Sequence, residues 1–276
     1  MDTSSARTIL LGLLVSCCAL AAPAGVAEEA LEACTRPLTV GFYNFPPFYY
    51  QDAESGRWRG IDKDVVDELA ARSGCRIEAV FESRVRIWAQ MKNGALDLTT
   101  SALRTDERER YARFIPYHLS HNLLVLSTQD ATAPVDARAA LGSDTLTLAV
   151  TRSYRYGPPF DAWVARLADT GRVFESADEA DALRLVALGR VTAAINRESA
   201  LPFLATPYGQ DKFRTLDFGG EPLLGHLVVS RARIGEPVFR RLADAVAAMR
   251  RDGTLRKIFL RHVPAPTAER MLPPAP

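Results

Sequence analysis

Residues 96–108 read Leu-Asp-Leu-Thr-Thr-Ser-Ala-Leu-Arg-Thr-Asp-Glu-Arg, and the rest of the chain is organised around them. The apolar start, residues 96–98, is typical of a short strand. Thr105 has the chemistry of a helix N-cap, because the two acidic residues after it would fill the first helical turn. The stretch therefore predicts a strand that leads into the N-terminus of a helix.

The junction between this strand and this helix carries several groups that bind anions. A helix N-terminus presents free backbone N–H groups, and the hydroxyls of Thr100 and Ser101 lie beside it in the sequence. Arg108 adds a cation on the first turn. Donors and a fixed cation at one point suit a carboxylate, so we predict an anion site here. A solvated helix cap with surface arginines is the alternative.

The composition places few limits on function. The 276 residues are 47% hydrophobic and 24% charged, which is ordinary for a globular chain of one large or two medium domains. The formal net charge of +1 gives no reason to expect nucleic acid or an acidic membrane surface as a partner. Any electrostatic recognition must therefore be local.

The N-terminus has the pattern of a secretory signal. Arg7 precedes an apolar run, residues 9–15, that is too short to span a bilayer, and small residues follow. We expect a signal peptide over residues 1–27 and a periplasmic location for the mature protein. The sequence Leu-Val-Ser-Cys that ends at Cys17 also resembles the lipobox of bacterial lipoproteins. A lipid anchor on Cys17 is therefore the alternative to a soluble, cleaved protein.

Two cysteines, Cys34 and Cys75, remain after the signal. Each precedes a predicted strand, at residues 38–41 and 76–80. If these strands are adjacent and parallel, both cysteines lie at the same edge of a sheet. A cysteine pair in an oxidising compartment favours a disulfide, with two free thiols as the alternative.

The first part of the chain alternates strands and helices. We expect strands at residues 38–41, 76–80 and 96–99, with helices at residues 62–73 and about 87–93 between them. This alternation predicts a parallel sheet with covering helices. The first strand leads into an aromatic loop, residues 42–50, which two prolines stiffen. Aromatic side chains on a loop line either a core or a ligand cleft.

A second alternating unit follows a strand at residues 122–127 and a polar break. We expect its strands at residues 145–150, 173–174 and 193–196, and its helices from about residue 161 and from a capping box at residues 176–179. A strand at residues 226–230 and an amphipathic helix at residues 237–251 come next. The proline-rich tail, residues 264–276, is expected to be disordered.

Several short motifs occur in an order that is known from one family. They are Phe45-Pro46-Pro47-Phe48, Gly60-Ile61-Asp62-Lys63-Asp64, Asn93-Gly94-Ala95-Leu96-Asp97, Thr105-Asp106-Glu107-Arg108 and Phe114-Ile115-Pro116-Tyr117. With them, the chain from about residue 37 to residue 262 resembles the extracellular solute-binding proteins of family 3. These are the periplasmic receptors for polar amino acids in ABC importers. No single motif is decisive, but so many in register are a strong signal.

The resemblance implies an α/β fold of two lobes, the type II periplasmic-binding-protein fold. Each lobe would be a small, mostly parallel sheet flanked by helices. Residues 28–125 would begin lobe one, residues 126–222 would form lobe two, and residues 223–263 would return to lobe one as a strand and C-terminal helices. The crossings near residues 124–127 and 221–225 would form a hinge, and the ligand would be clamped between the lobes.

The resemblance also implies which residues hold the ligand. Lobe one would place an aromatic ring at Phe45, donors over residues 100–103 and a bidentate guanidinium at Arg108. Lobe two would contribute residues 152–154, a strand-to-helix loop whose helix N-terminus faces the ligand carboxylate. The expected ligand-binding set is Tyr43, Phe45, Arg84, Thr100, Ser101, Leu103, Arg108, Arg152, Ser153, Tyr154 and Arg197.

Arg197 departs from the family pattern, in which an acidic residue at this place holds an α-ammonium group. Glu198 would substitute only with a shift of register, and Leu103 replaces a hydroxyl residue often used on the carboxylate. Further arginines that could add charge to the cleft are Arg84, Arg86, Arg104 and Arg152. An unpaired Arg197 would repel an ammonium group, which favours a ligand negative at both ends or a carboxylate whose far end accepts hydrogen bonds.

Three functions fit this pattern. The first is a receptor that delivers a small carboxylate-bearing solute, an amino acid or a related organic anion, to the permease of an ABC importer. The second is a ligand-sensing domain for a membrane sensor. The third is an enzyme like the family's periplasmic cyclohexadienyl dehydratase, for which Glu198 is the one candidate acid. The sequence contains no metal, phosphate-loop or nucleophile motif. We therefore expect a monomeric, non-enzymatic protein that uses no cofactor and no metal.

Overall fold

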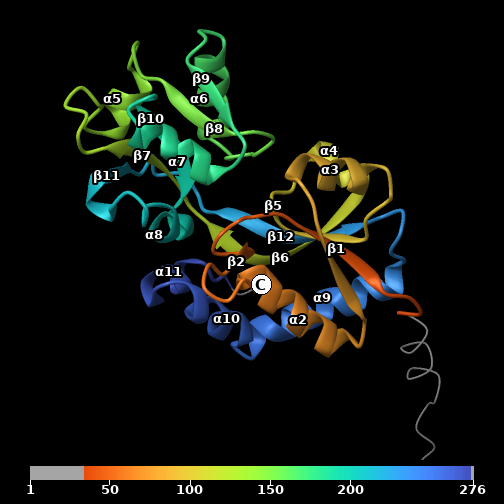
Figure 1. The fold of residues 1–276 in the computed structure, drawn as a ribbon. Coiled ribbons are helices and arrows are strands. Elements are labelled where there is room, and N and C mark those ends of the chain that lie inside the picture. Colours follow the sequence, from red (N-terminus) through yellow and green to blue (C-terminus); the bar gives the residue numbers. More distant parts are fainter. Residues whose placement is uncertain (1–33, 275–276) are drawn as a thin grey trace, which may run out of the picture. The chain divides into compact units, whose positions relative to one another are not determined.

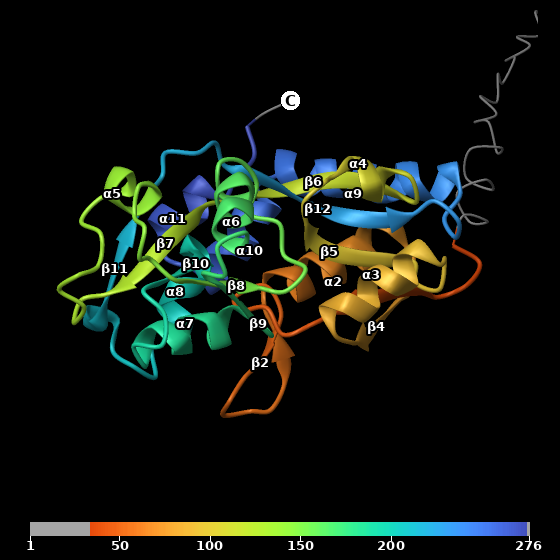
Figure 2. The same cartoon turned by 90° about the horizontal axis from the view of Figure 1, so that it is seen from above.

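The computed structural model describes residues 34–274, which belong to one compact unit. Two five-stranded sheets organise these residues, and each sheet is the centre of one lobe (Figure 1, Figure 2). Helices pack on both faces of each sheet, so the α/β class and the two-lobe fold are confirmed. The expected signal peptide, residues 1–27, and the Cys17 anchor lie outside the described residues.

The sheet of lobe one is mixed, with strand order β4-β1-β5-β12-β6. Its strands are β1 (Leu38–Phe42), β4 (Ile77–Phe81), β5 (Leu98–Ala102), β6 (Ala112–Ser120) and β12 (Leu223–Ser230). β1 pairs in parallel with β4 and β5, as the alternation predicts. The returning strand β12 runs antiparallel to β5 and β6, so only half of the sheet is parallel.

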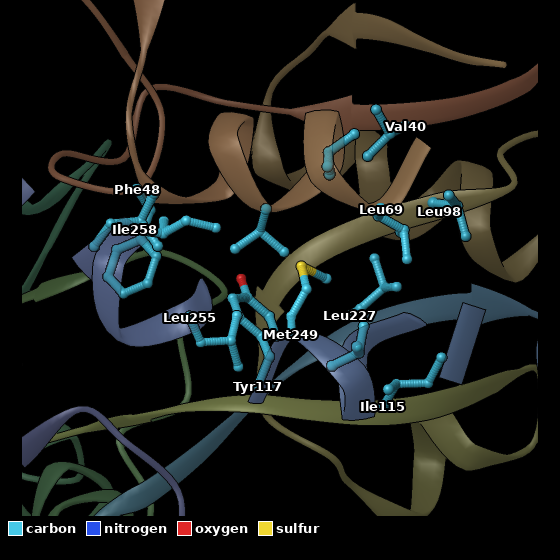
Figure 3. Packing of buried hydrophobic residues seen from close by; sticks show 14 of the residues in the cluster. Val40, Phe48, Leu69, Leu98, Ile115, Tyr117, Leu227, Met249, Leu255 and Ile258 are labelled. Atoms are coloured by element: carbon cyan, nitrogen blue, oxygen red, sulfur yellow. The ribbon is translucent and has the colours of Figure 1, made fainter. Parts of the chain in front are cut away.

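Helices cover both faces of this sheet and fix the strand ends that carry the site. α2 (Ile61–Ser73), α9 (Glu236–Arg251) and α10 (Thr254–His262) enclose the larger core, in which Val40, Leu69 and Met249 are fully buried (Figure 3). α3 (Arg84–Lys92) covers the other face with Ile87 and Met91. Burial of apolar surface contributes about 25 cal/mol per Å² and holds these layers together.

The sheet of lobe two has the order β11-β7-β10-β8-β9. Its strands are β7 (Asn122–Ser127), β8 (Leu148–Thr151), β9 (Val173–Ser176), β10 (Ala193–Arg197) and β11 (Phe213–Leu216). β8 is parallel to β9 and β10, whereas β7 is antiparallel to β10 and β11. One face carries α5 (Ala137–Leu141) and α6 (Phe160–Ala168), and the other carries α7 (Glu179–Ala187) and α8 (Leu201–Leu204).

Short elements complete the described chain. They are β2 (Tyr50–Gln51), β3 (Trp58–Arg59), α4 (Asp106–Glu109), α11 (Ala265–Arg270) and two 3₁₀ turns, Glu198–Ala200 and Gln210–Lys212. Within residues 34–274, every helix is too short or too polar to cross a membrane.

Cys34 and Cys75 form the expected disulfide, and their Cα atoms are 5.2 Å apart. Cys34 precedes β1 and Cys75 precedes β4. These two strands are adjacent and parallel, with Leu38 paired to Ile77. Parallel neighbours start at the same edge of a sheet, and this brings the two cysteines together.

The first crossing between the lobes lies at His121, between β6 and β7, rather than at residues 124–127. The sequence pattern does not reveal β6, which ends the first sheet. Because all of β7 pairs inside the second sheet, residues 122–125 belong to lobe two and not to lobe one. The return crossing, residues 217–222, comes before β12, so residues 223–225 of the expected crossing at 221–225 belong to that strand.

The expected disordered tail is wrong for its described part, because residues 265–270 form the helix α11. Ala268 and Met271 are buried in the core of lobe one. The backbone N–H of Leu119 in β6 donates to the carbonyl of Met271 at 2.7 Å. Proline is tolerated at the start of a helix, where its missing N–H would have no partner in any case.

Candidate functional site

The aromatic loop after β1 lies where the two lobes meet. Phe45 is 6% exposed, and its ring packs against Tyr43 and Phe48 of the same loop, with centroids 4.9 and 5.6 Å away. From lobe two, the ring of Tyr154 approaches Phe45 to 6.2 Å. The loop therefore joins the core of lobe one to a contact with lobe two.

A small cavity lies at the centre of this contact. Its volume is about 10 Å³, which is room for about one water molecule. Six of the expected ligand-binding residues line it: Phe45, Arg84, Ser101, Leu103, Tyr154 and Arg197. The structure thus brings these side chains together from both lobes, with the lobes closed on each other.

Arg197 is not the unpaired cation that the sequence predicts. It is 1% exposed at the end of β10, and its Nε donates to both carboxylate oxygens of Glu179, at 3.1 and 3.0 Å. Its backbone N–H donates to the same carboxylate at 3.1 Å. Glu179 begins α7, whose N-cap is Asp178 and not Ser176. The prediction fails because the neutralising acid comes from a different element, 18 residues away in the chain.

The Arg197 guanidinium also reaches lobe one. Its Nη2 donates to the carbonyl of Pro46 at 2.8 Å, and its carbon lies 3.5 Å from the ring centroid of Phe45. A guanidinium over an aromatic face is attracted by the ring quadrupole, more so when water is excluded. The Arg197–Glu179 pair therefore connects the lobes through side chains of the protein itself.

Arg108 lies where the sequence predicts a carboxylate grip. It is 8% exposed on α4, and its backbone N–H donates to the N-cap hydroxyl of Thr105 at 3.3 Å, as expected. The guanidinium lies 3.7 Å from the ring centroid of Trp88, and Nη1 donates to the carbonyl of Leu103 at 2.8 Å. Within the described residues no carboxylate pairs with it. Burial, and the positive charge of Arg84 nearby, lower the pKa of Arg108 to about 10.

A larger cavity, of about 470 Å³, opens beside Arg108. Trp88 lines it from lobe one, and Ser153, Tyr154 and Arg155 line it from lobe two. Ser153 has a φ of 60°, which a residue other than glycine seldom adopts. The loop over residues 152–154 therefore does reach a cavity between the lobes, as expected, although through only two of its three side chains.

Two backbone N–H groups of the loop before α6 have a partner in the chain itself. Asp161, on the first turn of α6, accepts the backbone N–H of Tyr156 at 2.8 Å and that of Gly157 at 3.2 Å. These two donors are therefore not free for a ligand. That the helix N-terminus faces a ligand carboxylate stays a prediction.

A buried acid, Asp62, lies behind Ser101. Ser101 Oγ donates to Asp62 at 2.9 Å, and the Tyr117 hydroxyl donates to the same carboxylate oxygen. The Nε2 atom of His118 lies 3.3 Å from Ser101 Oγ. Burial raises the pKa of Asp62 to about 6 and lowers that of His118 to about 3. Ser101 is thus fixed by lobe one, with its hydroxyl proton directed at Asp62.

Three expected ligand-binding residues line neither of these cavities: Thr100, Arg152 and Tyr43. Thr100 is 4% exposed in β5, and its side chain lowers the pKa of the Asp62 carboxyl. Arg152 is exposed and pairs with Glu175 at 3.2 Å. The other groups weighed from the sequence also have partners: Arg86 pairs with Glu82, Arg104 with Glu109, and Glu198 with Arg270.

Tyr43 and Arg84 contact each other in a third cavity, which Phe45 also lines. Arg84 Nη1 donates to the Tyr43 hydroxyl, and both residues line this cavity of about 270 Å³. Arg84 Nε donates to the carbonyl of Ser153 at 3.3 Å, and its guanidinium carbon lies 4.9 Å from the ring of Tyr154. Arg84 therefore connects α3 of lobe one to the loop over residues 152–154 of lobe two.

The sequence matches the bacterial extracellular solute-binding proteins, family 3, over residues 38–265, which is most of the chain. The chain belongs to this family. The L-cystine-binding protein TcyA of Bacillus subtilis (strain 168) is 24% identical over 225 residues, which are 80% of this chain and 79% of that protein.

Solved structures of the same fold superpose over nearly the whole length. A histidine kinase sensor domain with similarity to periplasmic binding proteins gives a TM-score of 0.72 at 16% identity, covering 88% of this chain and 100% of that one. An ancestral arginine-binding protein bound to glutamine gives a TM-score of 0.68 at 20% identity, covering 82% of this chain and 97% of that one. At such identities the likeness establishes the fold.

Three residues that shape the site of this family member are absent from the sequence prediction: Trp88, Arg155 and Glu179. From the sequence, Trp88 is only one of the apolar residues of the helix α3. The structure adds its contact with the guanidinium of Arg108, which lies over the Trp88 ring. Arg155 directly follows the predicted loop, so extending that loop by one residue would find it. Glu179 carries no local signal, because the fold alone brings it to Arg197.

Proposed function

We propose that the protein binds a small carboxylate-bearing solute, an amino acid or a related organic anion, between its lobes and delivers it to the permease of an ABC importer. One observation carries the proposal. Arg108 is 8% exposed beside a cavity of about 470 Å³, with no carboxylate partner in the described chain. A desolvated guanidinium destabilises a protein unless an anion compensates it, so an incoming carboxylate would gain most at this point.

Export belongs to the same proposal, because a receptor for an importer must meet its solute outside the cytoplasm. The apolar segment within residues 1–27 supports a signal peptide. We take the mature protein to act as a monomer in the periplasm. A ligand that touches both lobes would favour the closed arrangement, which is the form a permease would recognise.

Calorimetry and thermal shift over amino acids and small organic acids test this proposal. A ligand with a carboxylate should bind, and Arg108→Ala should weaken it about 30-fold or more, equivalent to about 2 kcal/mol. Arg104→Ala is the matched control, because Arg104 is exposed, lies four residues earlier and pairs with Glu109. Equal affinity in the wild type and a folded Arg108→Ala variant would refute the carboxylate grip.

A sensory role is the second candidate, because a histidine kinase sensor domain superposes on this chain with a TM-score of 0.72. The two roles share the binding step and differ in the partner. Loss of solute uptake in a deletion strain would identify a transport receptor, whereas unchanged uptake with an altered transcriptional response would identify a sensor. A dehydratase has less support, because its candidate acid, Glu198, is ion-paired with Arg270.

A further inference from the structure

The arginines around the cleft fall into two groups. Three have a carboxylate partner: Arg104 with Glu109, Arg152 with Glu175, and Arg197 with Glu179. Three others, Arg84, Arg108 and Arg155, have no acidic partner within residues 34–274. The sequence alone cannot separate these groups, because all six belong to the same few loops and helix starts.

The unpaired arginines line two cavities that share Tyr154 and Arg155 in their walls. Arg108 of α4 and Arg155 of the loop after β8 line the cavity of about 470 Å³ from opposite lobes. Arg84 and Arg155 both line the small central cavity as well. The positive charges of Arg84 and Arg155 each lower the pKa of Arg108, so both repel its guanidinium.

The acids that face the larger cavity do not neutralise this cluster. Glu175 is bound to Arg152, and Asp161 accepts the backbone N–H groups of the loop that carries Arg155. Glu107 is exposed, and its charge raises the pKa of Tyr111. Positive charge from both lobes therefore remains uncompensated at the cavity.

We propose that this cavity takes a small organic dianion, with one carboxylate on Arg108 and a second acidic group on Arg155. The first contact rests on the proposed function, and the second is new. Arg155 is exposed, but it lines the cavity from the lobe opposite to Arg108 and has no acidic partner in residues 34–274. A single carboxylate on Arg108 would leave this second cation available, and a second acidic group would pair with it and connect the two lobes through the ligand.

The size and lining of the cavity agree with such a ligand. About 470 Å³ lies in the range of small-molecule sites. Trp88 and Tyr154 also line the cavity and give it aromatic surface, which suits a short carbon chain. The Arg197–Glu179 pair fills the position where the family pattern holds an ammonium group, so an amino group on the ligand gains no free acid there.

Matched ligand pairs that differ in one charge test the proposal. Succinate, glutarate and L-glutamate are compared by calorimetry with their monoamides succinamate, glutaramate and L-glutamine. At least one diacid should bind the wild type tenfold or more tightly than its monoamide. Arg155→Ala should abolish this preference while the affinity for the monoamide stays within about threefold. Arg152→Ala is the control and should retain the preference, because Arg152 is already paired with Glu175.

Each other outcome has a defined meaning. A monoamide that binds as tightly as its diacid, a preference that survives in Arg155→Ala, or no binding of any diacid would each overturn the dianion proposal. The proposed function fails separately. If Arg108→Ala leaves the affinity for a bound monocarboxylate unchanged, the first contact is wrong; if it weakens that ligand without any diacid preference in the wild type, only the dianion proposal is wrong.

Discussion

Arg197 stands where the family pattern has an acid, and yet a carboxylate is present at this place because Glu179 binds the guanidinium. The two charges form a buried neutral unit. Removing one partner of such a pair leaves an unpaired charge and costs about 3–5 kcal/mol. The net charge that can select a ligand therefore comes from Arg108 and its unpaired neighbours.

Asp62 makes the stability of the protein depend on pH. Its pKa is about 6 in the folded state, against the ordinary 3.8, so the folded state holds an extra proton between about pH 4 and pH 6. The stability that Asp62 contributes therefore falls as pH rises through this window. Relative to the wild type, Asp62→Asn should gain up to about 3 kcal/mol in free energy of unfolding between pH 4 and pH 6.5.

His118 acts in the opposite direction, because its pKa falls from 6.5 to about 3 on burial. The unfolded state then binds the extra proton between about pH 3 and pH 6.5, so this contribution rises with pH. Urea unfolding of the wild type and of Asp62→Asn is measured at each pH. The contribution of His118 is present in both proteins, so it cancels in the difference between their free energies of unfolding. A difference in stability that stays constant from pH 4 to pH 6.5 would show that folding does not raise the pKa of Asp62.

At the scale of the element, α11 is folded by its contacts rather than by its own sequence. Six residues with two prolines nearby are far too few for an independent helix. Met271, at its C-cap, is 3% exposed and joins the core of lobe one. Met271→Ala should therefore cost about 2–4 kcal/mol in free energy of unfolding, measured in urea.

Glu269→Ala is the matched control for Met271→Ala. Glu269 lies on the same helix, is exposed, and pairs with Arg256 at the surface. Such a pair contributes less than about 1 kcal/mol. If the two variants lose the same small amount of free energy of unfolding, the packing of Met271 does not stabilise the core of lobe one.

At the scale of the whole molecule, the lobes are connected by the protein's own side chains. Arg197 donates to Pro46, Arg84 donates to Ser153, and Arg270 pairs with Glu198. Arg197→Ala removes the buried contact among these, so the ligand-free protein should shift toward an open form. Small-angle scattering should then give a larger radius of gyration than for the wild type.

Arg184→Ala, which removes an exposed ion pair with Asp181 inside lobe two, should leave the scattering unchanged. Circular dichroism shows whether the Arg197→Ala variant still folds with Glu179 unpaired. Identical scattering from a folded Arg197→Ala variant and the wild type would mean that the remaining contacts between the lobes suffice to hold them together.

The sequence by itself determined the local structure and the class of fold. Apolar runs alternating with helical periodicity predict the α/β lobes, and Thr105 predicts the start of α4, because these signals involve residues close together in the chain. The disulfide follows in the same way, since Cys34 and Cys75 each precede a strand of one parallel pair. The aromatic loop and Arg108 are found because family motifs mark them.

Only the tertiary structure decided which charges are free and which chain segments are buried. Pro116 conceals β6 in the sequence, and the strand forms because it lies at a sheet edge, where proline is tolerated. Glu179 neutralises Arg197 because α7 and β10 pack together, whereas none of the acids that line the larger cavity pairs with Arg108 or Arg155. Charge in a cleft depends on distances of a few ångströms between elements remote in sequence, and only the folded chain sets those distances.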